Sequence, residues 1–353
     1  MRLGSMSPLP TRAVGRTGLG VSLMGFGSAP LGELYAKLDE DICAATVRGA
    51  RNAGITLFDS SPHYGNGLAE HRLGSALRKF PRDNYVLCTK VGRHMNPLSK
   101  PAAATAEDVI SPGFAGGLSH PAKFDYSYDG VMRSVEQSLL RLATSHIDIL
   151  LIHDVDVWTH GDQMETRFKE AMEGAYVALD KLRSEKVVKA IGCGLNESEM
   201  CERFARAGDF DCMLLAGRYS LLEQDALNSF LPLAVEKNIS ILLGGVFNSG
   251  ILATGPIPGA KYNYRDAPPD IMQRAARIEA LCKSHNVPLP VAAMRFALGH
   301  PAIASIVLGA VTPQEIARNM EGFTQRVPQS LWKDLRAAGL MRDDAPMPPE
   351  ALS

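Results

Sequence analysis

The sequence lacks long uncharged apolar runs and any excess of charge of one sign. No stretch reaches the length of about 18 apolar residues that a membrane span needs, and the first twenty residues hold no apolar segment of signal-peptide length. Lys and Arg number 37 and Asp and Glu number 38, so there is neither a basic surface for nucleic acid nor an acidic tail. We therefore expect a soluble cytoplasmic protein that binds a small molecule and neither nucleic acid nor membrane. The oligomeric state stays open.

Paired cysteines and metal-ligand spacings are also missing. The six cysteines are scattered, none forms a Cys-x-x-Cys pair, and most lie in apolar runs such as YVLCTK and AIGCGL. This pattern favours buried, reduced thiols. There is no HxxxH or HExxH spacing, no GxSxG elbow and no P-loop. The sequence thus predicts no metal site, no serine-hydrolase nucleophile and no P-loop site for a nucleoside triphosphate.

What is present is a repeated alternation of apolar runs and helical patterns. The eight runs are residues 22–28, 55–60, 84–90, 147–154, 187–194, 210–218, 239–247 and 304–311. The helical patterns between them include residues 39–54, 129–144 and 222–238. Strands that are apolar on both faces and alternate with helices indicate a parallel sheet. Eight such units predict one closed (β/α)8 TIM barrel over residues 1–353, and a doubly wound open sheet is the alternative.

Three segments depart from a minimal barrel. Residues 1–20 include a Gly-Leu-Gly turn between short runs, which favours a hairpin before the first barrel strand. Residues 91–128, after the third strand, are rich in Pro, Ala, Ser and Gly, and a connection of this length usually forms a lid or substrate wall. Residues 341–353 read as a mobile C-terminal tail.

Polar residues close three neighbouring strands of the predicted barrel. Asp59 ends the second strand, with Tyr64 just beyond it, Lys90 ends the third and His153 ends the fourth. Each also has an ordinary structural reading: Asp59 as a cap, Tyr64 as a half-buried aromatic and His153 as a core histidine. Lys90 is harder to dismiss, because a lysine at the end of a core strand needs a partner for its charge. Active sites of such barrels form where these strand ends meet.

Together the four residues suggest a site for proton transfer. A tyrosine with its ordinary pKa of about 10 is a poor acid or base at neutral pH. A nearby ammonium favours the phenolate and lowers that pKa, while a carboxylate keeps the ammonium charged and oriented. The histidine can hydrogen-bond the oxygen of a carbonyl or alcohol substrate. A Schiff-base role for Lys90 in an aldolase barrel is an alternative, against which the Asp59 and Tyr64 pair argues.

The segment GITLFDSSPHYGNGLAEHRLGSAL, followed by TKVG and LLIHD, resembles the aldo-keto reductase signature. In that family an aspartate, a tyrosine, a lysine and a histidine form the catalytic tetrad. By motif these fall on Asp59, Tyr64, Lys90 and His153. The resemblance runs over almost the whole chain, from GLGVSLMGFGSAPLG to PQEIARNM, and is nearest to the branch that contains aldose 1-dehydrogenases acting on L-fucose, L-galactose or D-arabinose, and pyridoxal 4-dehydrogenase.

The resemblance implies a nicotinamide nucleotide bound extended across the strand ends, without a Rossmann fold. Matching the family's elements gives the expected cofactor-binding residues Gly27, Asn196, Gly245, Phe247, Asn248, Gly250, Leu252, Gly309, Val311, Thr312, Glu315, Arg318 and Asn319. The family's usual nicotinamide-stacking tyrosine on the seventh strand is replaced by Gly244 or Gly245, which leaves Phe247 as a substitute candidate.

The charges near residue 312 bear on the choice between NAD and NADP. Thr312 and Pro313 resemble the start of a helix, whose N-terminus can hold a phosphate. Family members that use NADP commonly place a lysine and an arginine where this chain has Gly309 and Glu315. A 2′-phosphate would be repelled by Glu315, whereas a ribose diol could hydrogen-bond it. Arg318 is a counterargument, so NAD is favoured and NADP remains the alternative.

NAD agrees with oxidation as the direction of reaction. The expected function is oxidation of the C1 hemiacetal hydroxyl of a free aldose to a lactone, with Tyr64 as general acid and base. Trp158 and His160 suit a sugar site as an apolar plate and a hydroxyl partner, and His63 and Tyr126 are further wall candidates. Trp158 has an alternative reading as a loop anchor. Alternatives for the function are pyridoxal 4-dehydrogenase, NADPH-dependent aldehyde reductase and a non-catalytic nicotinamide-binding regulatory protein.

Overall fold

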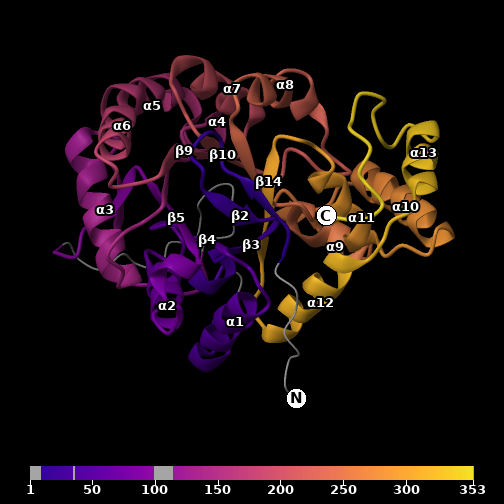
Figure 1. The fold of residues 1–353 in the computed structure, drawn as a ribbon, viewed down its shortest axis with the longest axis horizontal. Coiled ribbons are helices and arrows are strands. Elements are labelled where there is room, and N and C mark those ends of the chain that lie inside the picture. The colour runs from indigo at the N-terminus through magenta and orange to yellow at the C-terminus, as the bar shows by residue number, and fades with distance from the viewer. Residues whose placement is uncertain (1–8, 35, 99–113, 353) are drawn as a thin grey trace.

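The computed structural model describes residues 9–34, 36–98 and 114–352. Within these residues eight parallel strands close a barrel in chain order, which confirms the predicted (β/α)8 barrel (Figure 1). The barrel strands are β3 (Met24–Gly27), β4 (Leu57–Asp59), β5 (Val86–Val91), β8 (Ile149–His153), β9 (Ala190–Leu195), β10 (Cys212–Ala216), β11 (Ser240–Gly244) and β14 (Ile303–Gly309). Each overlaps one of the eight apolar runs.

Helices surround the barrel on its outside (Figure 1). They are α1 (Glu40–Asn52), α2 (Leu68–Leu77), α3 (Tyr128–Leu142), α4 (Val157–His160), α5 (Met164–Glu170), α6 (Val177–Ser184), α7 (Ser198–Ala207), α8 (Phe230–Glu236), α9 (Ile251–Thr254), α10 (Pro269–Ser284), α11 (Leu289–Leu298), α12 (Pro313–Thr324) and α13 (Gln329–Ala337). Helix α1 shows why they form: Asp39 caps it by accepting from Ile42 N, and Cys43, Val47 and Ala50 are buried at helical spacing. None of the described helices is long and apolar enough to cross a bilayer.

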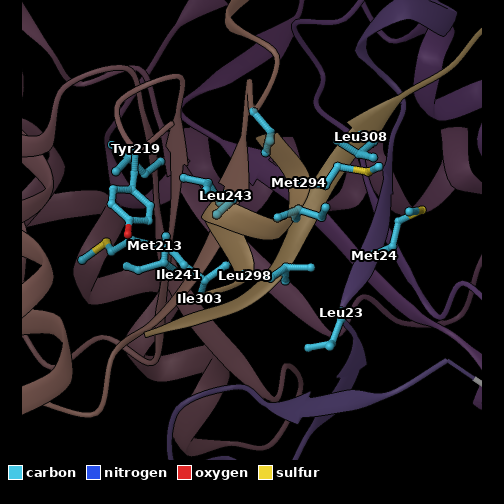
Figure 2. Packing of buried hydrophobic residues seen from close by; sticks show 14 of the residues in the cluster. Leu23, Met24, Met213, Tyr219, Ile241, Leu243, Met294, Leu298, Ile303 and Leu308 are labelled. Atoms are coloured by element: carbon cyan, nitrogen blue, oxygen red, sulfur yellow. The ribbon is translucent and has the colours of Figure 1, made fainter. Parts of the chain in front are cut away.

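Along most barrel strands, neighbouring residues enter two separate cores. On β8, Ile149 and Leu151 belong to the cluster that fills the barrel, whereas Leu150 and Ile152 pack toward the helices. Figure 2 shows part of the outer core, in which Met294 of α11 lies among the strand residues. The six cysteines are all buried and free, as the sequence predicts. This packing makes the strand ends rigid supports for the side chains that follow them.

An N-terminal hairpin closes one end of the barrel. Strands β1 (Thr11–Ala13) and β2 (Gly20–Ser22) pair antiparallel, in agreement with the expected hairpin, although it ends two residues later than residue 20. Val14, Leu19 and Val21 join the interior cluster at the end where the barrel strands begin. The hairpin does not cover the opposite end of the barrel, where the strands finish and where the candidate site lies.

The long connection after β5 is partly ordered as a second hairpin. Strands β6 (Arg93–Met95) and β7 (Ala122–Phe124) pair antiparallel. The stretch between them includes residues 99–113, which lie outside the described residues. After these residues the chain is described again. Ala115 N donates to Glu33 O at 2.7 Å, and Leu118 N donates to Gly65 O at 2.9 Å. Residues 114–118 therefore lie against the loop that carries Tyr64.

Two local expectations are wrong. Residues 341–352 pack onto the outer helices instead of forming a mobile tail: Met341 is buried, and Gln329 Nε2 of α13 donates to Pro348 O at 2.6 Å. The expected helix over residues 222–238 begins only at Phe230, because Pro232 has no N–H and fits only in a first helical turn.

Candidate active site

The structure brings the four expected catalytic residues together at the finishing end of the barrel. Asp59 and His153 are the last residues of β4 and β8, Lys90 lies near the end of β5, and Tyr64 follows in the loop after β4. Lys90 Nζ donates to both oxygens of Asp59 at 2.9 Å and to Ser60 O at 2.7 Å. It also lies 4.9 Å from the centre of the Tyr64 ring. The rings of Tyr64 and His153 have their centres 6.1 Å apart.

Lys90 and Asp59 form a buried ion pair. Burial raises the pKa of Asp59, and the charge of Lys90 opposes that rise. For Lys90, burial by itself lowers the pKa, but the charge of Asp59 and the contacts around it outweigh burial and hold the pKa above its ordinary value. Lys90 therefore stays an ammonium ion, and Asp59 fixes its position beside Tyr64.

Tyr64 differs from the expectation of a lowered pKa. Burial raises the pKa of its phenol above the ordinary value, and the nearby charge of Lys90 offsets only part of that rise. The charge of Lys90 lowers this pKa as expected, but desolvation of the phenol raises it by more. Tyr64 is a neutral phenol at neutral pH in the protein alone.

His153 is held by its Nδ1 atom. That atom lies 3.1 Å from Ser61 Oγ and 3.2 Å from Nη1 of Arg93. Burial lowers the pKa of His153 well below its ordinary value, and the charges of Arg93 and Lys90 lower it further. The imidazole is therefore neutral at physiological pH and acts as a hydrogen-bonding group rather than as a cation.

A cavity of about 280 Å³ lies above these residues and is lined by Tyr64, Lys90 and His153. A second cavity, of about 170 Å³, lies toward the ends of β10 and β11. Four residues line both: Trp158, Asn196, Ala216 and Tyr264. The two cavities adjoin and form an elongated space across the strand ends.

The four expected substrate residues divide into two pairs. His63 and Trp158 line the larger cavity. Tyr126 and His160 do not, which corrects that expectation. The hydroxyl of Tyr126 is buried behind the site, donates to His153 O at 2.8 Å and lies 3.0 Å from His160 Nε2. Tyr126 thus supports the backbone of His153, and His160 contacts Tyr126 rather than the cavity.

The expected cofactor residues lie at the ends of β3, β9, β11 and β14, but few face the space. Asn196, Gly245 and Asn248 line the second cavity. The others do not, and Leu252 is packed in the core. The residues that line neither cavity are Gly27, Phe247, Gly250, Gly309, Val311, Thr312, Glu315, Arg318 and Asn319.

Helix α12 begins with a reciprocal cap. Thr312 Oγ1 accepts from Glu315 N at 3.2 Å, and Glu315 Oε2 accepts from Val311 N at 2.8 Å. The spacing Thr-Pro-Gln-Glu is that of a capping box. A carboxylate thus already occupies the N-terminus at which the sequence placed a phosphate.

Several lining residues were not predicted from the sequence. Arg93, Phe114 and Asp154 line the larger cavity, and Tyr264 lines both. Tyr264 lies in the turn between β12 (Lys261–Tyr262) and β13 (Arg265–Asp266) with a φ of 62°, a conformation that bulky residues rarely adopt. The sequence could have indicated Asp154, since it directly follows His153 at the end of a barrel strand. Among the described residues no group of three or more His, Cys, Asp or Glu is placed to hold a metal ion.

The sequence model of the aldo/keto reductase family matches residues 23–339. The chain belongs to the aldo/keto reductase family. It is 41% identical to a pyridoxal 4-dehydrogenase of Microbacterium luteolum over 94% of this chain and 97% of that one. It is 37% identical to a D-threo-aldose 1-dehydrogenase of a Pseudomonas species over 93% of this chain and 97% of that one. An aldo-keto reductase from Bacillus halodurans in its holo form shares the fold, with a TM-score of 0.71, 22% identity, and coverage of 95% of this chain and 97% of that one.

Aldo-keto reductases bind a nicotinamide nucleotide, and the lining of the second cavity suits part of such a group. Gly217 and Gly245 expose their backbones to it, and a Cβ at Gly245 would lie 2.8 Å from Gly217 N. The amide of Asn196 can pair with a carboxamide or a ribose, and Arg218 places a positive charge on the same wall. The larger cavity then remains for the substrate, next to Tyr64.

Proposed function

We propose that this aldo-keto reductase oxidises the C1 hemiacetal hydroxyl of a cyclic free aldose to a lactone, with NAD as the hydride acceptor. The observation that carries the proposal is the buried Lys90 and Asp59 pair beside Tyr64, at the base of a cavity that His153 also lines. The D-threo-aldose 1-dehydrogenase relative supports the choice of substrate class.

In the proposed reaction each residue has one task. The substrate hydroxyl lies between Tyr64 and His153, and the phenolate form of Tyr64 accepts its proton. The ammonium of Lys90 stabilises that phenolate, and Asp59 keeps Lys90 in place. His153, as a neutral imidazole, orients the substrate oxygen through a hydrogen bond. The bound nicotinamide supplies the hydride acceptor, and the carbon that loses the hydride becomes the lactone carbonyl.

Glu315 supports NAD over NADP in this proposal. Its carboxylate is fixed at the start of α12 by the bond from Val311 N, so it keeps its position at the N-terminus of that helix. A dianionic 2′-phosphate there would meet a like charge, whereas the 2′-hydroxyl of NAD can donate to a carboxylate. The same feature argues against an aldehyde reductase that uses NADPH.

Pyridoxal is the second candidate substrate. The 41% identity to a pyridoxal 4-dehydrogenase favours it, and so do the flat side chains His63, Phe114 and Trp158 on the wall of the larger cavity. Pyridoxal also forms a cyclic hemiacetal, so Tyr64 and His153 would act on it in the same way. A non-catalytic nicotinamide-binding role is disfavoured, because it has no use for the buried ion pair beside Tyr64.

The test is a substrate panel with the purified protein. L-Fucose, L-galactose, D-arabinose and pyridoxal are each supplied with NAD or NADP, NADH or NADPH formation is followed, and the product is identified as a lactone by mass spectrometry. NAD-linked turnover of one of the sugars supports the main proposal. Turnover of pyridoxal alone replaces it with the second candidate, and no oxidation of any of the four contradicts both.

A further inference from the structure

Arg93 is the one arginine among the described residues that lines the larger cavity, and it reaches the site because of Gly92. Gly92 has a φ of 103°, and a Cβ there would lie 2.3 Å from the Tyr126 ring, so only glycine fits. This turn directs the chain from β5 into β6 and brings Arg93 beside His153. The guanidinium carbon of Arg93 lies 4.2 Å from the centre of the Phe124 ring, which holds the group in place.

We propose that Arg93 is a positioning residue that fixes His153 as the tautomer with its proton on Nε2. A guanidinium donates hydrogen bonds and accepts none. Nη1 of Arg93 lies 3.2 Å from Nδ1 of His153, so Nδ1 has to be the accepting nitrogen. Ser61 agrees, because its hydroxyl accepts from His63 N at 3.1 Å and is free to donate to the same Nδ1. The proton of the neutral imidazole then lies on Nε2.

The consequence concerns the reaction proposed above, on which this role rests. With its proton on Nε2, His153 donates a hydrogen bond to the substrate oxygen. The other tautomer would present a lone pair and compete with Tyr64 for the substrate proton. Arg93 acts on the reaction through His153, as an orienting group does in other sites where the tautomer of a histidine matters.

Asp154 holds Arg93 from the other side. Its Oδ2 accepts from the same Nη1 at 2.7 Å, and its Oδ1 lies 3.4 Å from His153 Nε2. Asp154 has a φ of 55°, and its N–H donates to Gly194 O at 3.0 Å, so the backbone turns sharply after His153. Without Arg93, the carboxylate of Asp154 would be left beside His153 and would favour its cationic form.

The charged and titratable groups that face His153 come from four segments of the chain. They are Arg93 of β6, Lys90 of β5, Asp154 after β8, and His63 and Tyr64 of the loop after β4. Two cations oppose protonation of His153 and one carboxylate favours it. Loss of Arg93 changes that balance toward protonation, whereas Arg93→Lys preserves it.

The tautomer is measured by nitrogen-15 NMR of the histidine rings in the full-length protein. His153 is assigned as the resonance missing from a His153→Gln spectrum. We expect an unprotonated Nδ1 and a protonated Nε2 in the wild type, with no titration from about pH 5.5 to 9, and a higher pKa for His153 in Arg93→Met than in the wild type. A wild-type His153 protonated at Nδ1 overturns the inference, and so does an unchanged His153 spectrum in Arg93→Met. The wild-type spectrum decides the tautomer even if the variant does not fold.

Kinetics give the second measurement, with any substrate that the panel identifies. In Arg93→Met we expect kcat to fall about 10- to 100-fold with a smaller change in KM, which is less than the loss on removing a general acid or base. Arg93→Lys should recover part of the loss. The matched control is Arg82→Met, which breaks the ion pair with Asp148 at the opposite end of β8 and should keep kcat. An equal fall in kcat for both variants contradicts the positioning role. If the panel yields no substrate, the proposed function fails while the NMR result still decides the tautomer.

Discussion

The ammonium group of Lys90 lies 2.9 Å from each carboxylate oxygen of Asp59, and both side chains are almost wholly buried. Removing one partner leaves the other charge without compensation, so Lys90→Met should lower the free energy of unfolding by about 3–5 kcal/mol. The double variant Asp59→Asn/Lys90→Met removes both charges and should recover much of that loss. Urea unfolding of the two variants measures it. A double variant that is less stable than Lys90→Met would show that the charges are not coupled as described.

The pH dependence of the reaction follows from Tyr64. Because burial raises the pKa of its phenol, the phenolate needed for oxidation becomes more populated as pH rises, while the neutral phenol needed for reduction is present throughout the neutral range. We expect kcat/KM for oxidation to increase with pH without a plateau up to about pH 10, the ordinary pKa of tyrosine. Initial rates in buffers of constant ionic strength measure it. A plateau for oxidation below neutral pH would contradict the raised pKa.

Trp158 should contribute to binding more than to chemistry. It lines both cavities, and its backbone N–H is held by Glu197 Oε1 at 2.9 Å, so the loop stays in place when the ring is removed. For Trp158→Ala we expect KM for the substrate to rise about tenfold with kcat changed by less than about threefold. Trp158→Phe keeps an apolar ring and should lose less. Unchanged KM in Trp158→Ala would indicate that the indole only anchors the loop.

Glu315 should determine which nucleotide is used. Glu315→Gln keeps an oxygen for Val311 N but removes the charge that repels a 2′-phosphate. We expect kcat/KM for NADP to rise on the order of tenfold, with little change for NAD. The matched control is Glu321→Gln, further along α12 and exposed, which should alter neither value. A NADP preference already present in the wild type would contradict this account.

The sequence predicted the parts of the site that regular structure determines. Asp59, Lys90 and His153 end neighbouring parallel strands, and such ends meet at one edge, so their proximity followed from the strand pattern alone. The directions in which loop side chains point could not be predicted from that pattern. Tyr126 and His160 were expected on the wall of the cavity, but they bond to each other, and Tyr126 donates to His153 O.

The extent of desolvation and the local backbone conformation also could not be predicted from the sequence. Whether the pKa of Tyr64 ends below or above its ordinary value depends on how deeply the phenol is buried, which no pattern of residues reveals. Arg93 reaches His153 only because Gly92 turns the chain. Conversely, the start of α12 was predictable, because Thr312 and Glu315 have the spacing of a capping box, although its consequence for a bound phosphate required the geometry.

The most direct test of the account is Tyr64→Phe, assayed for NAD binding by calorimetry and for NAD-linked oxidation of the panel substrates. The wall of the second cavity does not include Tyr64, so NAD binding should stay within about twofold, while kcat falls by roughly 10²–10⁴-fold because the proton acceptor is lost. Tyr85→Phe, at the opposite end of the barrel, is the matched control and should keep kcat. A Tyr64→Phe protein that binds NAD and keeps full activity would contradict the account.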